Sequence, residues 1–102
     1  MTDVTATITS KDREEKLRNT IDNLRSQKDV DIEIIVVDDK SEDPYEFDME
    51  EVTVIRNKEN THEPYARNRA ISRASGKYIL MIDDDNILKG DNWLRKAIDK
   101  LE

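Results

Sequence analysis

The eight residues Ile-Glu-Ile-Ile-Val-Val-Asp-Asp at positions 32–39 carry the strongest structural signal in the chain. Apart from Glu33, the first six are all aliphatic and β-branched, which is typical of a strand buried on both faces of a parallel sheet. The apolar run stops abruptly at Asp38 and Asp39. The segment therefore predicts a central strand over residues 32–37 that delivers two carboxylates to one edge of a sheet.

Shorter apolar blocks lie on both sides of this segment. Each predicts a further strand, over residues 4–9, 52–55 and 78–82. Apolar residues also recur at helical spacing in three segments, over residues 13–28, from Pro64 to Gly76 and from Asp91 to the end of the chain. Strands that alternate with helices imply a parallel sheet with right-handed crossovers.

These patterns predict a single α/β domain over residues 1–102, because a chain of this length forms one core. We expect a three-layer, Rossmann-like architecture with a mostly parallel four-stranded sheet in the order 3-2-1-4 and helices on both faces. Trp93 is expected in the core, whereas the acidic run 42–51 is expected to be a solvated loop. The other residues expected in the core are Ile8, Leu17, Ile21, Leu24, Ile34, Val36, Val54, Ala70, Ile71, Ile79, Met81, Leu94 and Ile98.

Polar or small residues at the expected helix ends are interpreted as caps. Asp12, followed three residues later by Glu15, resembles a capping box with Asp in place of Ser or Thr. Gly76 suits the residue after a helix C-terminus, and Asp91 suits an N-cap.

Composition excludes several classes of site. The absence of cysteine excludes disulfides, thiolate metal sites and cysteine nucleophiles, and the single histidine, His62, excludes a multi-histidine zinc site. A net charge of -7 disfavours nucleic acid as a partner. No apolar run approaches membrane-spanning length and no signal peptide is visible, so the default expectation is a cytoplasmic protein.

Hydroxyl or carboxylate side chains follow three of the predicted strands. They are Thr9, Ser10 and Asp12, then Asp38 and Asp39, then Asp83, Asp84 and Asp85. In a parallel sheet these side chains converge on one edge, where ligands bind. Oxygen ligands favour Mg²⁺ or Mn²⁺, and magnesium usually takes one or two carboxylates together with water and phosphate oxygens. The cluster indicates a metal-bridged phosphate substrate, although Asp is also common in turns and that structural explanation stays open.

Four segments, taken together, resemble a known family. They are residues 8–13 (Ile-Thr-Ser-Lys-Asp-Arg), residues 31–41 around the Asp38-Asp39 pair, residues 66–70 (Ala-Arg-Asn-Arg-Ala) and residues 75–85 with the Asp triplet. Their order and spacing resemble the nucleotide-sugar-binding half of family 2 glycosyltransferases over about residues 4–95. The resemblance implies the GT-A fold, a UDP-sugar donor, Mg²⁺ or Mn²⁺ as cofactor, and sugar transfer with inversion in the full-length enzyme.

The resemblance also implies roles for individual residues. Thr9 matches a position that lines the nucleobase pocket, and Asp39 matches the acidic residue that hydrogen-bonds the base. The triplet matches the DXD-type motif, in which Asp85 would bind the metal and Asp83 or Asp84 would face the ribose or the sugar. Two cations, Arg67 and Lys11, are candidates for a phosphate contact. Lys11 replaces the aromatic residue that stacks on the base in the family. For each cation a structural explanation stays open beside the phosphate contact, namely that Arg67 pairs with an acidic side chain and that Lys11 is simply solvated.

Family catalytic domains are much longer than this chain, and their second half carries the acceptor site and the general base. We therefore expect the donor-binding portion of a glycosyltransferase, with no catalytic residue assigned and the acceptor unknown. The alternative is a non-catalytic scaffold that keeps the fold without transferase activity. A phospho-accepting receiver domain is disfavoured, because its acidic pair follows the first strand. Without a second half the sheet exposes an apolar edge, so self-association is a further expectation. His62, in a polar loop, is expected to have no role.

Overall fold

A computed structural model describes residues 2–57 and 63–102, without the side chains of residues 63–66, so His62 lies outside the described residues. The sheet consists of β1 (Val4–Ser10), β2 (Ile32–Asp39), β3 (Val52–Asn57) and β4 (Tyr78–Met81). The strands are ordered β3-β2-β1-β4 and every neighbouring pair is parallel. The predicted fold class and strand order are therefore confirmed.

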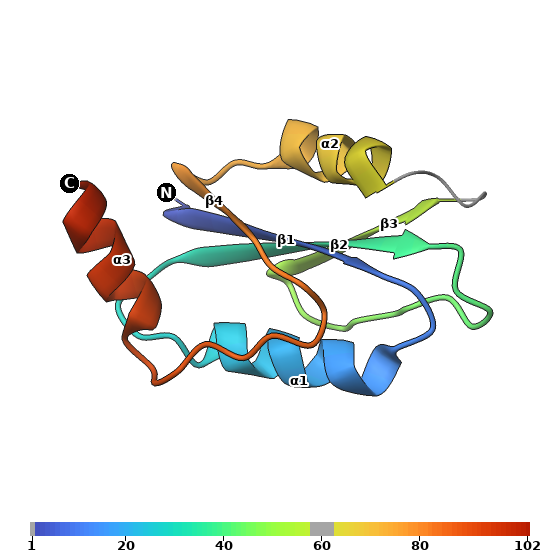
Figure 1. Ribbon diagram of the computed structural model, residues 1–102, viewed down its shortest axis with the longest axis horizontal. Helices are drawn as coiled ribbons and strands as arrows, with labels where there is room; N and C mark the ends of the chain where they lie inside the picture. Colours follow the sequence, from blue (N-terminus) through green and yellow to red (C-terminus); the bar gives the residue numbers. More distant parts are fainter. Residues whose placement is uncertain (1, 58–62) are drawn as a thin grey trace.

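Helices lie on both faces of this sheet (Figure 1). Helix α1 (Glu14–Arg25) covers one face and α2 (Glu63–Arg73) the other, while α3 (Trp93–Leu101) lies beyond the amino ends of the strands. The carboxyl ends of β1 and β2 lie at the opposite end of the sheet, away from α3. Among the described residues no helix is both long and apolar enough to cross a membrane.

The core has two parts, one on each face of the sheet. Ile8, Ile34 and Val36 are fully buried against α1, together with Leu17, Ile21 and Leu24 from that helix. On the other face, Ile35, Val37 and Ile55 pack with Ala70 of α2. Both faces of β2 are thus buried, as its continuous aliphatic run predicts. The buried state is also confirmed for Leu94 and Ile98, whereas Val54 and Ile71 are only half-buried.

The edge strand β4 differs from the prediction. Ile79 and Met81 are 42% and 54% exposed, although both were predicted in the core. They pair with Thr5 and Thr7, which places them on the α2 face of the sheet. That helix packs mainly against β1 and β2, so the end of the sheet at β4 stays uncovered. Trp93, also predicted in the core, is 42% exposed because Leu94 and Ile98 form the inward face of α3.

The predicted caps are wrong in all three places. Helix α1 begins after Arg13 and α3 after Asn92, and neither cap residue makes a side-chain hydrogen bond to the helix. Asp12 instead has a positive φ of 53° and accepts a hydrogen bond from the Glu42 backbone N–H. Helix α1 also ends earlier than predicted, at Arg25.

Gly76 is needed for close packing and does not end a helix. Helix α2 ends at Arg73, and the backbone N–H of Gly76 donates to the Thr5 hydroxyl at 2.8 Å. A Cβ at this position would lie 2.5 Å from the backbone nitrogen of Thr5. The absence of a side chain therefore lets the segment before β4 approach β1.

Candidate functional site

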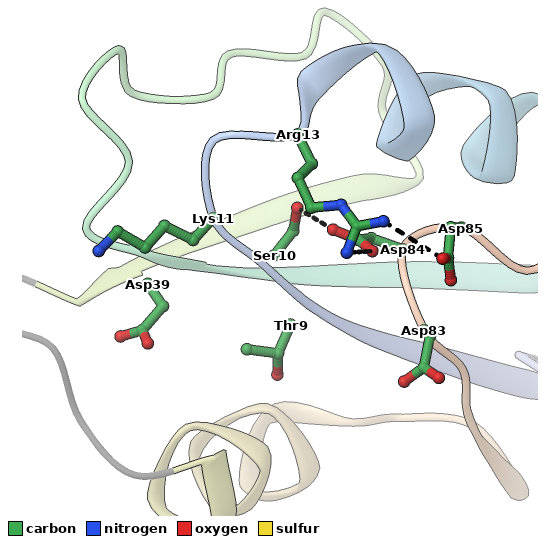
Figure 2. Close-up of a pocket in the computed structure, with 8 residues that line it drawn as sticks. All are labelled: Thr9, Ser10, Lys11, Arg13, Asp39, Asp83, Asp84 and Asp85. Carbon is green, nitrogen blue, oxygen red and sulfur yellow. Dashed lines mark hydrogen bonds and ion pairs between the residues drawn. The ribbon is translucent and has the colours of Figure 1, made fainter.

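A pocket of about 480 Å³ opens at the carboxyl end of the sheet (Figure 2). The ends of β1 and β2 and the segment after β4 supply its walls, which are lined by Thr9, Ser10, Lys11, Arg13, Asp39, Asp83, Asp84 and Asp85. The parallel topology thus brings together the strand-end residues singled out in the sequence, except Asp12 and Asp38, which do not line this pocket. Arg13 is an addition that sequence reasoning missed.

Arg67, the remaining candidate, borders a smaller neighbouring pocket. This second pocket shares Thr9 and Asp83 with the first and is also lined by Thr7, Met81 and Ile82. Arg67 therefore lies on the α2 side of the site, next to Asp83.

The three aspartates after β4 have different surroundings. The Asp84 side chain is only 7% exposed, accepts a hydrogen bond from the Ser10 hydroxyl at 2.7 Å and lies 3.5 Å from the Arg13 guanidinium. Asp85 is 48% exposed and pairs with the other terminal nitrogen of Arg13 at 3.2 Å. Asp83 is exposed on the pocket side. Asp83 and Asp85 are therefore open to a ligand, whereas Asp84 is held by the protein.

Polar side chains of α1, and Gln27 just after its end, hold the segment that carries these aspartates. The Thr20 hydroxyl donates to the Asp84 carbonyl at 2.8 Å. Asn23 bonds both backbone groups of Leu88, at 3.0 and 2.7 Å. Gln27 donates to the Gly90 carbonyl at 2.8 Å. Thr20 and Asn23 are three residues apart on α1, so they meet the segment from the same face of the helix, and Gln27 extends the contact beyond the helix end. The spacing is visible in the sequence, but their partners are not.

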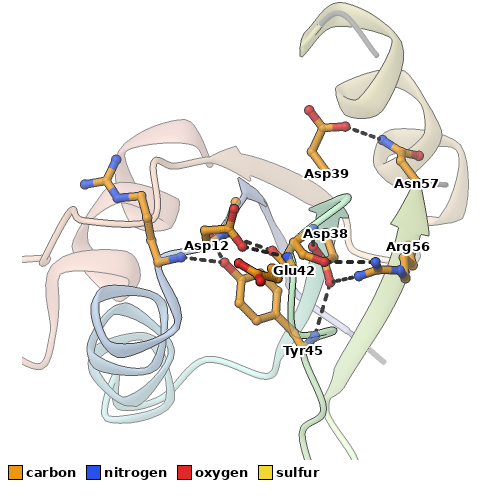
Figure 3. A network of polar contacts seen from close by, with 10 residues as sticks. Asp12, Asp38, Asp39, Glu42, Tyr45, Arg56 and Asn57 are labelled. Carbon is orange, nitrogen blue, oxygen red and sulfur yellow. Dashed lines mark hydrogen bonds and ion pairs between the residues drawn. The ribbon is translucent and has the colours of Figure 1, made fainter. Parts of the chain in front are cut away.

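The two aspartates at the end of β2 point in different directions (Figure 3). Asp38 is fully buried and accepts hydrogen bonds from the backbone N–H groups of Ser41 at 2.9 Å and Tyr45 at 3.1 Å. The Arg56 guanidinium donates to the same carboxylate at 2.9 Å. Burial raises the pKa of Asp38, but these hydrogen bonds and the Arg56 charge outweigh it, so the pKa lies below its usual value.

Asp39 is the member of the pair that faces the pocket. The Asn57 side-chain amide lies 3.4 Å from one of its carboxylate oxygens. In Figure 2 Asp39 and Asp83 lie on opposite sides of Thr9. The pocket thus has an acidic residue at each end, with a small hydroxyl side chain between them.

The segment after β2 is packed against the site, which corrects the prediction of a solvated loop. Tyr45 is only 5% exposed, and Phe47 and Met49 also pack against the core. The Tyr45 hydroxyl accepts from the Arg13 backbone N–H at 2.9 Å and lies 2.9 Å from the Ser10 hydroxyl oxygen. Because Ser10 donates its one hydrogen to Asp84, Tyr45 donates to Ser10.

A signal for this packing was present in the sequence. Apolar and acidic residues alternate over positions 45–49 (Tyr-Glu-Phe-Asp-Met), which is the pattern of a chain with one buried side. The alternation places Tyr45, Phe47 and Met49 on the same side. It is too short and too acidic to stand out against the surrounding residues.

The donor set limits which metal could bind here. Among the described residues no group of three or more His, Cys, Asp or Glu side chains could hold an ion by itself. Asp83 and Asp85 offer oxygen ligands only. This chemistry fits a hard divalent cation that takes one or two carboxylates and completes its coordination with water or phosphate oxygens.

Comparison with known proteins identifies a family. The sequence model of the protein family Glycosyl transferase family 2 matches residues 5–102 of this chain. A Bacillus subtilis protein whose name is teichuronic acid biosynthesis glycosyltransferase TuaG is 31% identical over 91 residues. The match covers 82% of this chain and 34% of TuaG. A poly(ribitol-phosphate) beta-glucosyltransferase of Bacillus spizizenii is 42% identical over 73 residues, covering 64% of this chain and 12% of that protein.

Solved structures share the architecture at lower identity. S. aureus TarS 1-349 in complex with UDP has a TM-score of 0.80 at 21% identity, over 95% of this chain and 31% of that one. The Pyrobaculum calidifontis mannosyltransferase PcManGT, in complex with GDP-Man and Mn²⁺, has a TM-score of 0.79 at 18% identity, over 93% of this chain and 31% of that one. The chain spans about a third or less of the length of the curated relatives that it matches.

Proposed function

The chain belongs to glycosyl transferase family 2 and has the GT-A fold, and from this we propose that it is the part of such an enzyme that binds a nucleoside-diphosphate sugar. The pocket at the carboxyl end of the sheet carries the proposal, because it combines exposed Asp83 and Asp85 with Asp39 at the far end. We favour a UDP-sugar as donor, since TarS binds UDP. Transfer with inversion belongs to the complete enzyme.

The pocket suggests how a donor would lie. Asp39 is assigned to the base, and Thr9 forms the wall between the base and the diphosphate. Asp85 is assigned to the metal. Asp83 is assigned to the ribose or the sugar in preference to Asp84, because both carboxylate oxygens of Asp84 contact Ser10 or Arg13.

Cationic side chains at the rim would add to this binding. Lys11 lines the pocket together with Asp39, and Arg67 lines the smaller neighbouring pocket together with Asp83. Phosphate oxygens are strong acceptors for both side chains. A divalent cation, Mg²⁺ or Mn²⁺, supplies charge neutralisation for the departing nucleoside diphosphate when bound at Asp85. The acceptor site and the general base are not assigned to residues of this chain.

The alternative is a scaffold that keeps the fold without binding a donor. A titration of UDP with Mg²⁺, followed by EDTA and read by backbone amide chemical shifts, separates the two. A donor site requires perturbations at Thr9, Asp39, Asp83 and Asp85 that EDTA reverses. Silence at millimolar UDP would favour the scaffold.

A matched pair of variants makes this titration sharper. Asp85→Asn removes one charge inside the pocket, and Asp48→Asn removes one charge from an exposed position outside the pocket lining. The proposal requires the first variant to lose the metal-dependent shifts and the second to keep them. Equal losses in both variants would mean that net charge, and not the pocket, determines binding.

A further inference from the structure

Arg13 spans the acidic side of the pocket (Figure 2). One terminal nitrogen of its guanidinium lies 3.5 Å from Asp84 and the other 3.2 Å from Asp85. Its side chain is 43% exposed, so the guanidinium reaches the carboxylates from the solvent side. Arg13 therefore contacts the carboxylate assigned to the metal.

The position of Arg13 does not depend on these ion pairs. Its backbone N–H donates to the Tyr45 hydroxyl at 2.9 Å, and its carbonyl accepts the Leu17 N–H at 3.0 Å. The backbone is thus anchored at the start of α1, while the long side chain is partly exposed. The Arg13–Asp85 pair is about half-exposed on both sides, and an ion pair of this kind contributes little net free energy, so its loss costs little.

Adjacent carboxylates repel one another unless a cation lies among them. In this structure the Arg13 guanidinium supplies that positive charge. A divalent cation on Asp85 would carry the same sign of charge beside the same oxygen atoms. The guanidinium and the metal therefore compete for Asp85.

We propose that Arg13 is a donor-binding residue that occupies the cation position at Asp85 and turns to the diphosphate when metal and donor bind. The inference rests on the proposed function, because it uses the donor's phosphates as the second partner. A guanidinium presents paired N–H groups that match two phosphate oxygens as well as they match a carboxylate. Arg13 would thus exchange one anionic partner for another without leaving the pocket.

The proposal makes the metal and the nucleotide respond in opposite directions to loss of Arg13. In Arg13→Gln without nucleotide, Mn²⁺ should bind about two- to fivefold more tightly, the factor that corresponds to an exposed ion pair. With saturating Mg²⁺, UDP should bind about tenfold or more weakly, because a charge-assisted contact to phosphate is lost. The free Mn²⁺ electron paramagnetic resonance signal measures the first quantity, and calorimetry measures the second.

Two further variants control the experiment. Arg95→Gln removes the same charge from α3, where Arg95 pairs with Asp99, and should change neither affinity. Arg13→Lys keeps the positive charge but loses the paired N–H groups of the guanidinium. Its Mn²⁺ affinity should therefore stay within about twofold of the wild type, while UDP should bind more weakly. Amide spectra confirm that each variant is folded.

The outcomes separate this inference from the proposed function. Weaker binding of both ligands to Arg13→Gln would indicate a merely structural role, and unchanged binding would indicate no role; either result overturns the inference. If the wild type binds Mn²⁺ but not UDP, the donor-binding function fails. The Mn²⁺ comparison then still decides whether Arg13 and the metal compete.

Discussion

The substitution Tyr45→Phe tests whether the segment after β2 stabilises the site. It removes one hydroxyl and leaves the buried ring in place. In the structure that hydroxyl accepts from the Arg13 backbone N–H and contacts the Ser10 hydroxyl, each at 2.9 Å. It is the link between the network around Asp38 and the aspartates after β4.

The expected loss of stability follows from these two contacts. A typical buried hydrogen bond contributes about 1 kcal/mol net, and a donor left without a partner costs about 1–3 kcal/mol. We therefore expect Tyr45→Phe to lower the free energy of unfolding by about 1–3 kcal/mol. In a domain of this size each kcal/mol lowers Tm by about 4–8 °C.

Urea unfolding at neutral pH measures this effect, and Tyr78→Phe is the matched control. The Tyr78 hydroxyl donates at 3.0 Å to exposed Glu102, so its removal should cost less than about 0.5 kcal/mol. The midpoint should fall for Tyr45→Phe with an unchanged slope, since the unfolded surface is the same. Equal effects of the two substitutions, or a loss below about 0.5 kcal/mol for Tyr45→Phe, would refute the reasoning.

Three other predictions follow from single residues. Asp38→Asn should lower the free energy of unfolding by about 1.5–3 kcal/mol at pH 7, because the charge-assisted hydrogen bond from Arg56 to the buried carboxylate is lost. Since folding lowers the pKa of Asp38, the stability that its carboxylate contributes is complete above the unfolded-state pKa of about 3.9 and is lost as pH falls below it. Urea unfolding between pH 7 and pH 2 should therefore show the difference in unfolding free energy between the wild type and Asp38→Asn becoming smaller. Gly76→Ala should destabilise by about 1–3 kcal/mol in urea unfolding, because its Cβ meets the β1 backbone, and a neutral result would contradict the close approach. Asp84→Asn should lower Tm by several degrees whereas Asp85→Asn mainly weakens Mn²⁺ binding, and the reverse order would contradict the assignment of the two carboxylates.

The fold was predictable because its signal comes from whole blocks of residues. The β-branched runs at residues 4–9 and 32–37 form strands whose burial needs no detailed knowledge of neighbours. The exposure of Met81 was not predictable from its aliphatic run, since it depends on which strands α2 covers. The cap at Asp12 failed for a related reason: its carboxylate binds the backbone at Glu42, thirty positions along the chain.

Residues of the pocket were predictable where chemistry and strand ends coincide, as for Asp39 and Asp85. Arg13 was missed because an arginine at the start of an amphipathic helix is usually a surface residue. Tyr45 was missed because an acidic segment around it indicates solvent. In both cases the function of the side chain depends on a long-range contact, to Asp85 and to Ser10, that local patterns do not encode.

A further regularity in the acidic pairs does lie in the sequence. At the ends of β1 and β2 successive side chains point to opposite faces, so residues with even and odd numbers separate. The segment after β4 that carries Asp83–Asp85 is not a strand but shows the same alternation in burial. The even set of Ser10, Asp38 and Asp84 is buried and bonded within the protein. The odd set of Thr9, Asp39, Asp83 and Asp85 is more exposed and lines the pocket together with Ser10 and Asp84.

Each acidic cluster therefore supplies two kinds of carboxylate. Asp38 accepts hydrogen bonds from the backbone and Asp84 from the Ser10 hydroxyl, and their neighbours Asp39 and Asp85 are thereby held toward the pocket. A buried carboxylate must be fully bonded to stay charged, which explains why the segment around Tyr45 is packed and not solvated. The stability of the fold and the position of the proposed donor ligands thus depend on adjacent residues of the same strand ends.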